Sequence, residues 1–147
     1  MLKAAILNLL SKEKTPVAEG DEVIFILHAQ DAKKRNSVEW KRVSKVTLAL
    51  LQELVGGGNI ERIPSEKKGF IALCNEDGLL MWSHGRAGKN ALAASLLQQT
   101  SRGFVEPILG FHCGNVVLCR ETAEGFCGLS DADVKEMEKC LSMFNLK

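Results

Sequence analysis

The sequence predicts a single α+β domain in which a largely antiparallel sheet of about five strands carries three to four helices packed on it. The chain has 147 residues, of which 46% are hydrophobic and 25% are charged, and these values are typical of one globular domain. Short apolar runs bounded by turn residues predict strands, and apolar residues spaced three and four apart predict helices. No repeat or linker interrupts the chain, so one domain is expected over residues 1–147.

Residues 1–36 are expected to add one helix and one strand to a core of residues 37–147. Apolar residues at helical spacing within residues 2–10 predict a short helix. Residues 23–27 read Val-Ile-Phe-Ile-Leu, and this continuously apolar, β-branched run predicts a buried strand. Residues 31–36 are polar and basic without periodicity, so they are expected to form an exposed loop.

A helix is predicted next. Ser37 stands at an N-cap position ahead of an apolar stripe that runs from Trp40 to Leu54. Gly56–Gly58 would end this helix, because glycine readily adopts the left-handed C-cap conformation. Pro64 and the turn after it leave residues 59–63 room for a short strand at most.

The second half of the chain is expected to alternate hairpins and helices. Residues 70–74 and 79–83 are apolar runs joined by Asn-Glu-Asp-Gly, which predicts two antiparallel strands. Residues 90–99 are rich in Ala and Leu and predict a helix that ends near Gly103. Strands are predicted at 105–111, 116–120 and 126–128. Ser130 is the expected N-cap of a last helix, whose apolar face would comprise Val134, Met137, Leu141 and Phe144.

Charge and cysteine usage narrow the function classes. The net charge of +1 gives no bulk attraction to nucleic acid or to an anionic membrane, and no apolar run approaches the roughly 20 residues that cross a bilayer. No secretory signal is recognisable at the start, so a cytoplasmic or nuclear protein is expected. The five cysteines include no CxxC pair and are expected to be reduced core residues: Cys74, Cys113, Cys119, Cys127 and Cys140.

No motif predicts a catalytic, cofactor or metal site. The Gly85–Lys89 loop resembles a phosphate-binding loop only in part, because Ser83 occupies the place of the first glycine and Asn90 that of the Ser or Thr that touches magnesium. A structural role is expected for this loop. His112 and Cys113 are neighbours on a predicted strand, so their side chains would point to opposite faces and could not act as a pair.

One basic cluster lies near an aromatic residue, Trp40, and this combination is the minimum for nucleic-acid contact. Trp40 is on the predicted apolar stripe, so we expect it to be buried and the charges to be solvated. Nucleic-acid binding is the alternative function that this cluster would serve. Its contact residues would be Lys33, Lys34, Arg35, Lys41, Arg42 and Lys45.

Three segments together resemble the roadblock/dynein light-chain domains over roughly residues 40–147: Leu50–Leu54, Gly69–Gly85 and the Ala/Leu-rich segment Ala91–Leu97. The resemblance implies a non-catalytic scaffold module that pairs with itself or a sister domain through sheet edges and central helices. Members of that family often act on small GTPases or on motor and membrane scaffolds. The extra amino-terminal helix and strand depart from the family pattern.

The interface under this interpretation lies on the segment Ala91–Leu97 and the edge strands beside it. Ala93 and Ala94 are small enough to let another helix approach closely. The residues expected at the contact are Ala91, Leu92, Ala94, Ser95 and Gln98. Two alternatives stay open. Residues 23–30, the Trp40 segment and residues 57–60 are similar to half of a LAGLIDADG-type DNA-binding domain without its metal-binding acid, and the Gly85–Lys89 loop could serve a small acyl- or phosphate-handling enzyme.

Overall fold

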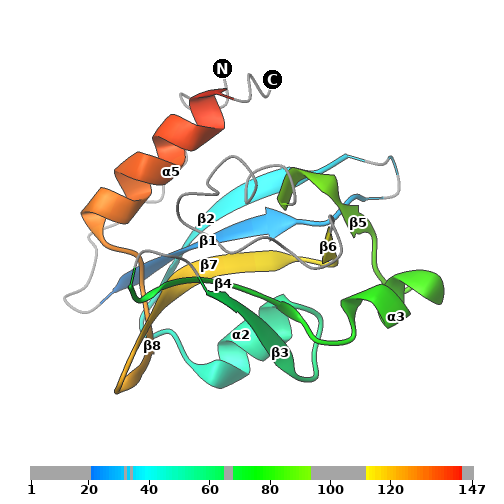
Figure 1. Cartoon of the computed structure of the whole chain (residues 1–147), viewed down its shortest axis with the longest axis horizontal. Helices are drawn as coiled ribbons and strands as arrows, with labels where there is room; N and C mark the ends of the chain where they lie inside the picture. Colours follow the sequence, from blue (N-terminus) through cyan, green and yellow to red (C-terminus); the bar gives the residue numbers. More distant parts are fainter. Residues whose placement is uncertain (1–20, 32, 34, 65–67, 94–111, 144–147) are drawn as a thin grey trace.

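A computed structural model describes residues 21–143 except for residues 32, 34, 65–67 and 94–111. It confirms the α+β class: a mostly antiparallel six-stranded sheet has helices on both faces (Figure 1). The strands of this sheet are β1 (Glu22–His28), β2 (Ser37–Val43), β3 (Ile60–Pro64), β4 (Phe70–Asn75), β7 (Val116–Thr122) and β8 (Gly125–Cys127). The helices with described bounds are α2 (Leu48–Leu54), α3 (Gly78–Ser83) and α5 (Asp131–Met143).

The strand order is β2-β1-β7-β4-β3, and β8 pairs with β7 beyond this path. Every pairing is antiparallel. Two short strands, β5 (Lys89–Asn90) and β6 (His112–Cys113), pair with each other in a separate small sheet. Strands β2 and β3 therefore form the two edges of the main path, while β7 lies at its centre.

Each face of the sheet has its own hydrophobic core. Strand β1 shows why, because Ile24 to Leu27 are at most 1% exposed and point alternately to the two faces. A strand buried on both faces needs a continuous apolar run, which is the pattern the sequence shows at 23–27. The face covered by α5 includes Phe25, Leu27, Trp40, Ala72, Leu118, Met137 and Leu141. The face covered by α2 includes Ile24, Ile26, Leu51, Val55, Leu73 and Val117.

The helix predicted from Ser37 to Leu54 is wrong over its first half. Ser37–Val43 is strand β2, paired along its whole length with β1, and Trp40 packs on Phe25 with 4.4 Å between ring centroids. The apolar residues of this segment fit the periods of both a helix and a strand. Trp40 and Val43 are three residues apart and would share a helix face, whereas Val38 and Trp40 are two apart and share a strand face. Pairing with the exposed edge of β1 decides the outcome, because β1 would otherwise lack half of its backbone partners.

Helix α2 begins only at Leu48. Thr47 is its N-cap, and the Thr47 hydroxyl accepts a hydrogen bond from the Leu50 N–H at 3.1 Å. The predicted glycine stop is confirmed: the Gly57 N–H donates to the Gln52 carbonyl and the Gly56 N–H to the Glu53 carbonyl. This pair of bonds is a Schellman motif, and Gly56 has the positive φ of 100° that the motif requires.

The predicted hairpin at residues 70–83 is also wrong in its second half. Residues 70–75 form β4, but Gly78–Ser83 is helix α3. Strand β4 is already paired on both sides, with β3 and with β7, so no edge is left for a strand from residue 79. Leu and Met have high helix propensity, and the segment folds as a single helical unit beside the sheet.

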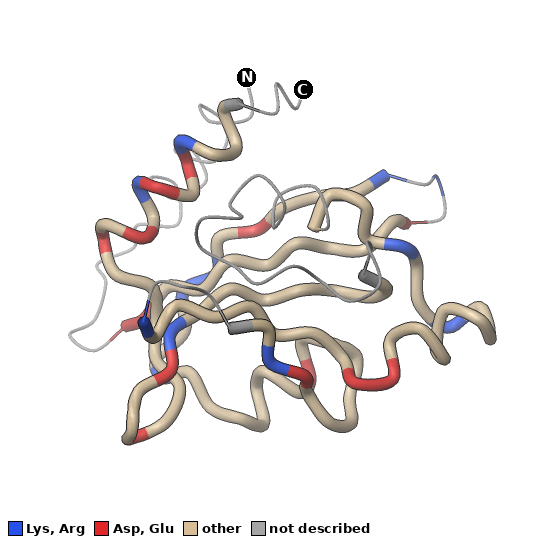
Figure 2. Tube along the Cα trace, in the orientation of Figure 1, with Lys and Arg blue, Asp and Glu red and all other residues tan. Residues whose placement is uncertain are grey.

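The last helix confirms the sequence prediction. The Ser130 hydroxyl accepts from the Asp133 N–H at 3.1 Å, and the Asp133 carboxylate accepts from the Ser130 N–H at 2.9 Å. This reciprocal arrangement is a capping box. Met137 and Leu141 are buried against the sheet, as expected, and Val134 is half-buried beside them, whereas Phe144 lies outside the described residues. Figure 2 shows acidic and basic residues interspersed along the rest of α5, which is typical of a solvated face.

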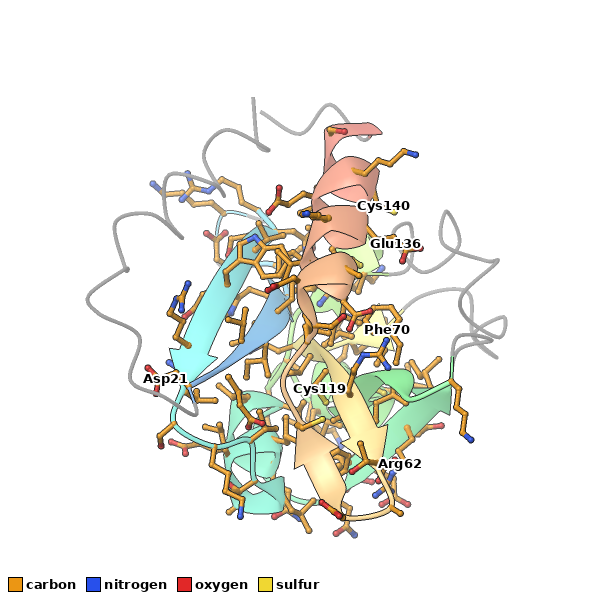
Figure 3. All side chains as sticks on the ribbon, turned by 90° about the vertical axis from the view of Figure 1, so that its left-hand side faces the viewer. Asp21, Arg62, Phe70, Cys119, Glu136 and Cys140 are labelled. Carbon is orange, nitrogen blue, oxygen red and sulfur yellow. The ribbon has the colours of Figure 1, made fainter. Side chains whose placement is uncertain are left out.

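Side chains on α5 are joined to the sheet by a buried ion pair. Arg120 of β7 donates to both carboxylate oxygens of Asp133, at 2.5 and 3.0 Å, and to the Lys68 carbonyl at 3.1 Å. The Asp133 side chain has no exposed area. Figure 3 looks onto this side of the molecule, where α5 rises from β7 and β8 with Cys140 on the helix and Cys119 within the sheet. We name this region the α5 end.

The remaining predicted elements have mixed outcomes. Strands at 59–63, 116–120 and 126–128 are confirmed as β3, β7 and β8. Helical structure is described at residues 91–93, and the predicted continuation lies outside the described residues, as do the helix at 2–10 and the strand at 105–111. No helix in the described part of the chain has the length and apolar character to span a membrane.

Candidate functional site

The opposite end of the sheet, where β1 and β4 finish and β7 begins, gathers the features that suggest function. It contains α3, the Gly56–Gly58 turn, β5 and β6 (Figure 1). We name this region the α3 end. Three asparagines tie its loops together, and none of them carries a charge: Asn75, Asn90 and Asn115.

Asn90 is the centre of this arrangement. It is completely buried, and its side-chain amide donates to the carbonyls of Leu27 at 2.8 Å and Gly114 at 2.9 Å. Its side-chain oxygen accepts from the Ala93 N–H at 3.0 Å and from the Asn36 amide at 3.3 Å. One side chain thus joins β1, the loop before β2 and the turn between β6 and β7 to the helical turn at residues 91–93, which it caps.

Asn75 and Asn115 hold the glycine turn and α2 in the same way. The Asn75 amide donates to the carbonyls of Val55 at 3.1 Å and Gly57 at 2.6 Å, and its oxygen accepts from the Asp77 N–H at 2.8 Å. The Asn115 amide donates to the Leu54 carbonyl at 3.1 Å, while its oxygen accepts from the Ala29 N–H at 2.8 Å. Buried amides satisfied in this way fix loop positions without ionisable groups.

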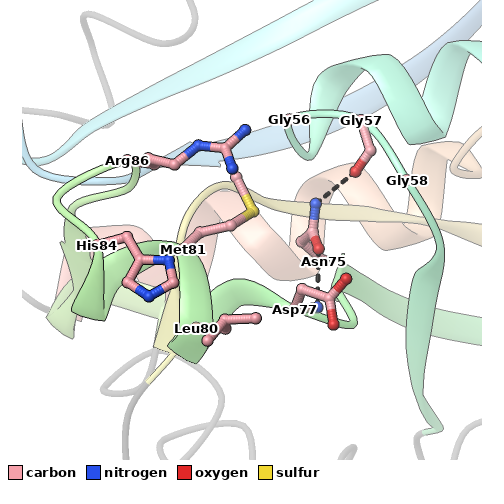
Figure 4. Close-up of a pocket in the computed structure, with 9 residues that line it drawn as sticks. All are labelled: Gly56, Gly57, Gly58, Asn75, Asp77, Leu80, Met81, His84 and Arg86. Carbon is pink, nitrogen blue, oxygen red and sulfur yellow. Dashed lines mark hydrogen bonds between the residues drawn. The ribbon is translucent and has the colours of Figure 1, made fainter.

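A pocket of about 330 Å³ lies between α3 and the glycine turn (Figure 4). Its residues come from two separate segments of the chain: Gly56, Gly57, Gly58, Asn75, Asp77, Leu80, Met81, His84 and Arg86. The Met81 methyl group lies so close to Gly56 that a Cβ at that glycine would be 3.2 Å from it. The Met81 side chain and the glycine turn therefore lie close together in the wall of the pocket.

Three pocket side chains carry polar groups that can contact a ligand. Asp77, His84 and Arg86 are exposed, and within the part of the chain that the structure describes their side chains make no hydrogen bond or ion pair. Their backbone positions are nevertheless fixed, because the N–H groups of all three donate, Asp77 to Asn75, His84 to Leu80 and Arg86 to Met81. The site thus presents one carboxylate and two basic side chains from an ordered backbone.

Helix α3 also exposes large apolar side chains next to this pocket. Leu79 is 46% exposed, Leu80 56% and Trp82 37%. The ammonium group of Lys89 lies 5.0 Å from the centre of the Trp82 ring, a cation–π distance. The apolar side chains of α3 were expected to lie on a strand of the sheet, so the sequence did not point to them as an exposed surface.

The predicted interface residues have partial outcomes. Ala91 is exposed, Leu92 is half-buried against the core on the α5 face, and Ala93, which was expected to face a partner helix, is completely buried in that core. Ala93 therefore cannot serve as a contact for a second helix. The other three interface residues, Ala94, Ser95 and Gln98, lie outside the described residues.

The predicted basic cluster is divided by strand β2. Lys33 and Arg35 are exposed at the loop before the strand, where Arg35 pairs with Asp31 at 3.4 Å, and Lys45 is exposed beyond its other end, roughly 20 Å away at ~3.4 Å per residue. Lys41 and Arg42 point to opposite faces of the strand, and Lys34 lies outside the described residues. Trp40 is buried, as expected, so it offers no stacking surface.

The Gly85–Lys89 loop is joined to its neighbours through its backbone. The Lys89 carbonyl accepts from the Gln30 N–H at 2.9 Å, and the Gly88 carbonyl accepts from the Gly114 N–H at 2.8 Å. A Cβ at Gly88 would come within 2.4 Å of the Gln30 carbonyl oxygen, so only glycine fits there. These contacts explain the glycine without any ligand.

The cysteines are free thiols, and Cys74, Cys113 and Cys119 are buried. Burial raises the pKa of the Cys74 thiol to about 12, with the charge of Glu61 acting in the same direction. Burial likewise raises the pKa of Cys119 to about 12. Thiols with such pKa values are protonated at neutral pH and are poor nucleophiles. Among the described residues, no three His, Cys, Asp or Glu side chains are grouped to hold a metal ion.

The asparagines and the pocket were not predicted from the sequence. A signal for Asn90 was present, because Asn is a favoured N-cap and stands directly before the Ala/Leu-rich segment. No comparable signal exists for the pocket, since residues 56–58 and 75–86 come together only when β3 pairs with β4.

Comparison with known families identifies one relative group. Residues 24–144 match the family described as Domain of unknown function (DUF3846), and the chain belongs to this family. The match spans both the α3 end and the α5 end of the sheet. No curated protein and no solved structure matches the chain.

Proposed function

We propose that the protein is a non-catalytic interaction module that pairs with a second copy of itself, or with a sister domain, through α3 and the helical turn that follows Asn90. The observation that carries the proposal is the exposure of Leu79, Leu80 and Trp82 on one six-residue helix. Large exposed apolar patches are rare on monomeric proteins, and where they occur they often mark interaction sites.

The surroundings of α3 support a contact surface. Ala91, which the sequence assigned to the interface, is exposed and follows the short strand that holds Lys89 and the buried Asn90. The loops of the α3 end are tied by uncharged amides whose hydrogen bonds are already made, so a partner that covers these ties buries no unsatisfied amide. Tryptophan, the residue type of Trp82, is enriched at the centres of protein interfaces.

The sheet edges form a second part of the proposal. Strands β2 and β3 lie at the ends of the main strand path, and edge strands can pair with a strand from another chain. Strand β3 ends in Pro64, which cannot donate a backbone hydrogen bond, so pairing there would stop at this residue. The resemblance to roadblock domains favours the same mode of pairing.

The decisive experiment compares two exposed leucines. Leu80→Glu places a charge in the proposed contact, whereas Leu48→Glu changes a residue of similar exposure, 48%, at the start of α2, the end of that helix away from the pocket. Light scattering after size exclusion should show a dimer for the wild type and for Leu48→Glu but a monomer for Leu80→Glu. Far-ultraviolet circular dichroism should be the same for all three proteins.

Two results would contradict the proposal. One is a wild type that stays monomeric at the highest soluble concentration and forms no cross-linked pair. The other is dissociation caused equally by Leu48→Glu, because a charge on any exposed leucine would then have the same effect and α3 would have no special part in pairing.

A further inference from the structure

The pocket beside α3 combines size, apolar lining and opposite charges in a way that the proposed pairing surface does not require. We propose that it binds a small zwitterion of the amino-acid type, a molecule with one carboxylate, one ammonium group and an apolar side chain. This inference goes beyond the proposed function and does not rest on it.

The volume sets the size of the ligand. About 330 Å³ is at the lower limit of the roughly 300 to 1,000 Å³ that small-molecule pockets occupy. The pocket is therefore too small for a dinucleotide or a long peptide and suits a single small molecule. Leu80 and Met81 supply the apolar lining, and methionine adapts its shape to fill irregular space against a ligand.

The Arg86 guanidinium group supplies the positive charge of the site. In the view of Figure 4 it lies above the Met81 side chain, toward Gly56, while the ring of His84 lies below Met81, beside Leu80. A guanidinium group presents a planar fork of donors that matches a carboxylate. Neither side chain is engaged elsewhere in the described part of the chain, so binding a carboxylate would break no internal bond.

The acidic end lies opposite. In the same view the Asp77 carboxylate lies on the other side of Leu80 and Met81, toward Gly58. A carboxylate attracts an ammonium group and repels a simple anion. A ligand with two opposite charges therefore satisfies both ends, whereas acetate or phosphate would satisfy one and be repelled by the other.

The backbone of the site is ordered before any ligand binds. Asn75 holds the Gly57 carbonyl at 2.6 Å and the Asp77 N–H at 2.8 Å, so the acidic end and the glycine turn are fixed to each other. The Arg86 N–H donates to the Met81 carbonyl at 2.7 Å, which fixes the basic end to α3. A preorganised site loses less conformational entropy when it binds a small molecule.

The test uses L-methionine and two analogues that each lack one charge. N-acetyl-L-methionine has no ammonium group, and L-methioninamide has no carboxylate. Isothermal titration of the wild type should show saturable binding of L-methionine, with each analogue at least about tenfold weaker, a difference of roughly 1.4 kcal/mol. Absence of saturable binding of L-methionine, or equal affinity for all three compounds, would overturn the inference.

Two variants assign the charges. Asp77→Asn should lose the preference for L-methionine over the N-acetyl compound, and Arg86→Gln should lose the preference over the amide. Lys45→Gln, an exposed basic residue away from the pocket, should retain both preferences. Unchanged preferences in Asp77→Asn and Arg86→Gln would also overturn the inference. Both variants keep the apolar residues of α3, so their molar mass in light scattering tests the pairing proposal separately.

Discussion

The two ends of the sheet are stabilised by different chemistry. At the α5 end, a buried ion pair between Arg120 and Asp133 joins a well-capped helix to the central strand. At the α3 end, the side chains of three asparagines bind backbone groups of loops that are far apart in the sequence. The three asparagines that tie the loops at the α3 end are uncharged, and among the described residues Asp77, His84 and Arg86 take no part in these ties, so their side chains are available for other contacts.

The largest effect is expected from Asn90→Ala. The substitution removes four hydrogen bonds from a completely buried side chain and leaves the carbonyls of Leu27 and Gly114 without their donor. Unsatisfied buried groups cost about 1–3 kcal/mol each, so the free energy of unfolding should fall by about 3 kcal/mol or more. Urea unfolding followed by circular dichroism measures this change.

Asn36→Ala is the matched control, because it removes only one of the partners of Asn90 and one bond to the His28 carbonyl. It should cost about 1 kcal/mol. If both variants lost the same free energy, the central role given to Asn90 at the α3 end would be wrong.

A smaller loss is expected at the α5 end from Asp133→Asn. Asparagine can still accept from the Ser130 N–H, but it leaves Arg120 without its counter-charge. Breaking a buried pair by removing one partner costs about 3–5 kcal/mol, and since the Arg120 side chain is 23% exposed and the cap is retained we expect about 2 kcal/mol. The same urea unfolding measurement applies.

Glu121→Gln provides the comparison on the surface. Glu121 pairs with Arg62 at 3.0 Å, but the two side chains are 30% and 50% exposed. Exposed pairs contribute about 0–1 kcal/mol, so this variant should be nearly neutral. An equal loss in both variants would show that burial does not distinguish the Arg120–Asp133 pair.

An effect smaller than that of Asp133→Asn is expected for each buried thiol at alkaline pH. The pKa of Cys74, next to the α3 end, and that of Cys119, next to the α5 end, are both raised by burial from 9.0 to about 12. Below pH 9 the thiols are protonated in both states, so the full stability is present. As pH rises toward 12, only the unfolded thiols ionise and stability falls, by about 1 kcal/mol per thiol at about pH 10.

Unfolding in urea at about pH 8 and about pH 10 tests this expectation. Cys74→Ala and Cys119→Ala should each remove a similar part of the pH dependence, although the two ends are held by different interactions. A pH dependence that is unchanged in both variants would show that other groups cause it.

The sequence could predict the elements whose local signals agree with their tertiary surroundings. The capping box of Ser130 and Asp133, the glycine stop after α2 and the continuous apolar run of β1 are each determined by residues close in the chain. The burial of Trp40 could also be predicted, because this residue lies on the apolar face of the segment whether the segment is a helix or a strand. The pocket could not be predicted, because no local pattern brings Gly56 close to Met81.

The sequence by itself determined the α+β class, the position of the last helix and the strands that occupy the centre of the sheet. Only the tertiary structure decided that Ser37–Val43 is a strand and Gly78–Ser83 a helix. In the first case β1 offered an edge with unpaired backbone groups, and in the second β4 had none left. The physical reason is that a segment compatible with both periods takes the structure in which its backbone hydrogen bonds can be made.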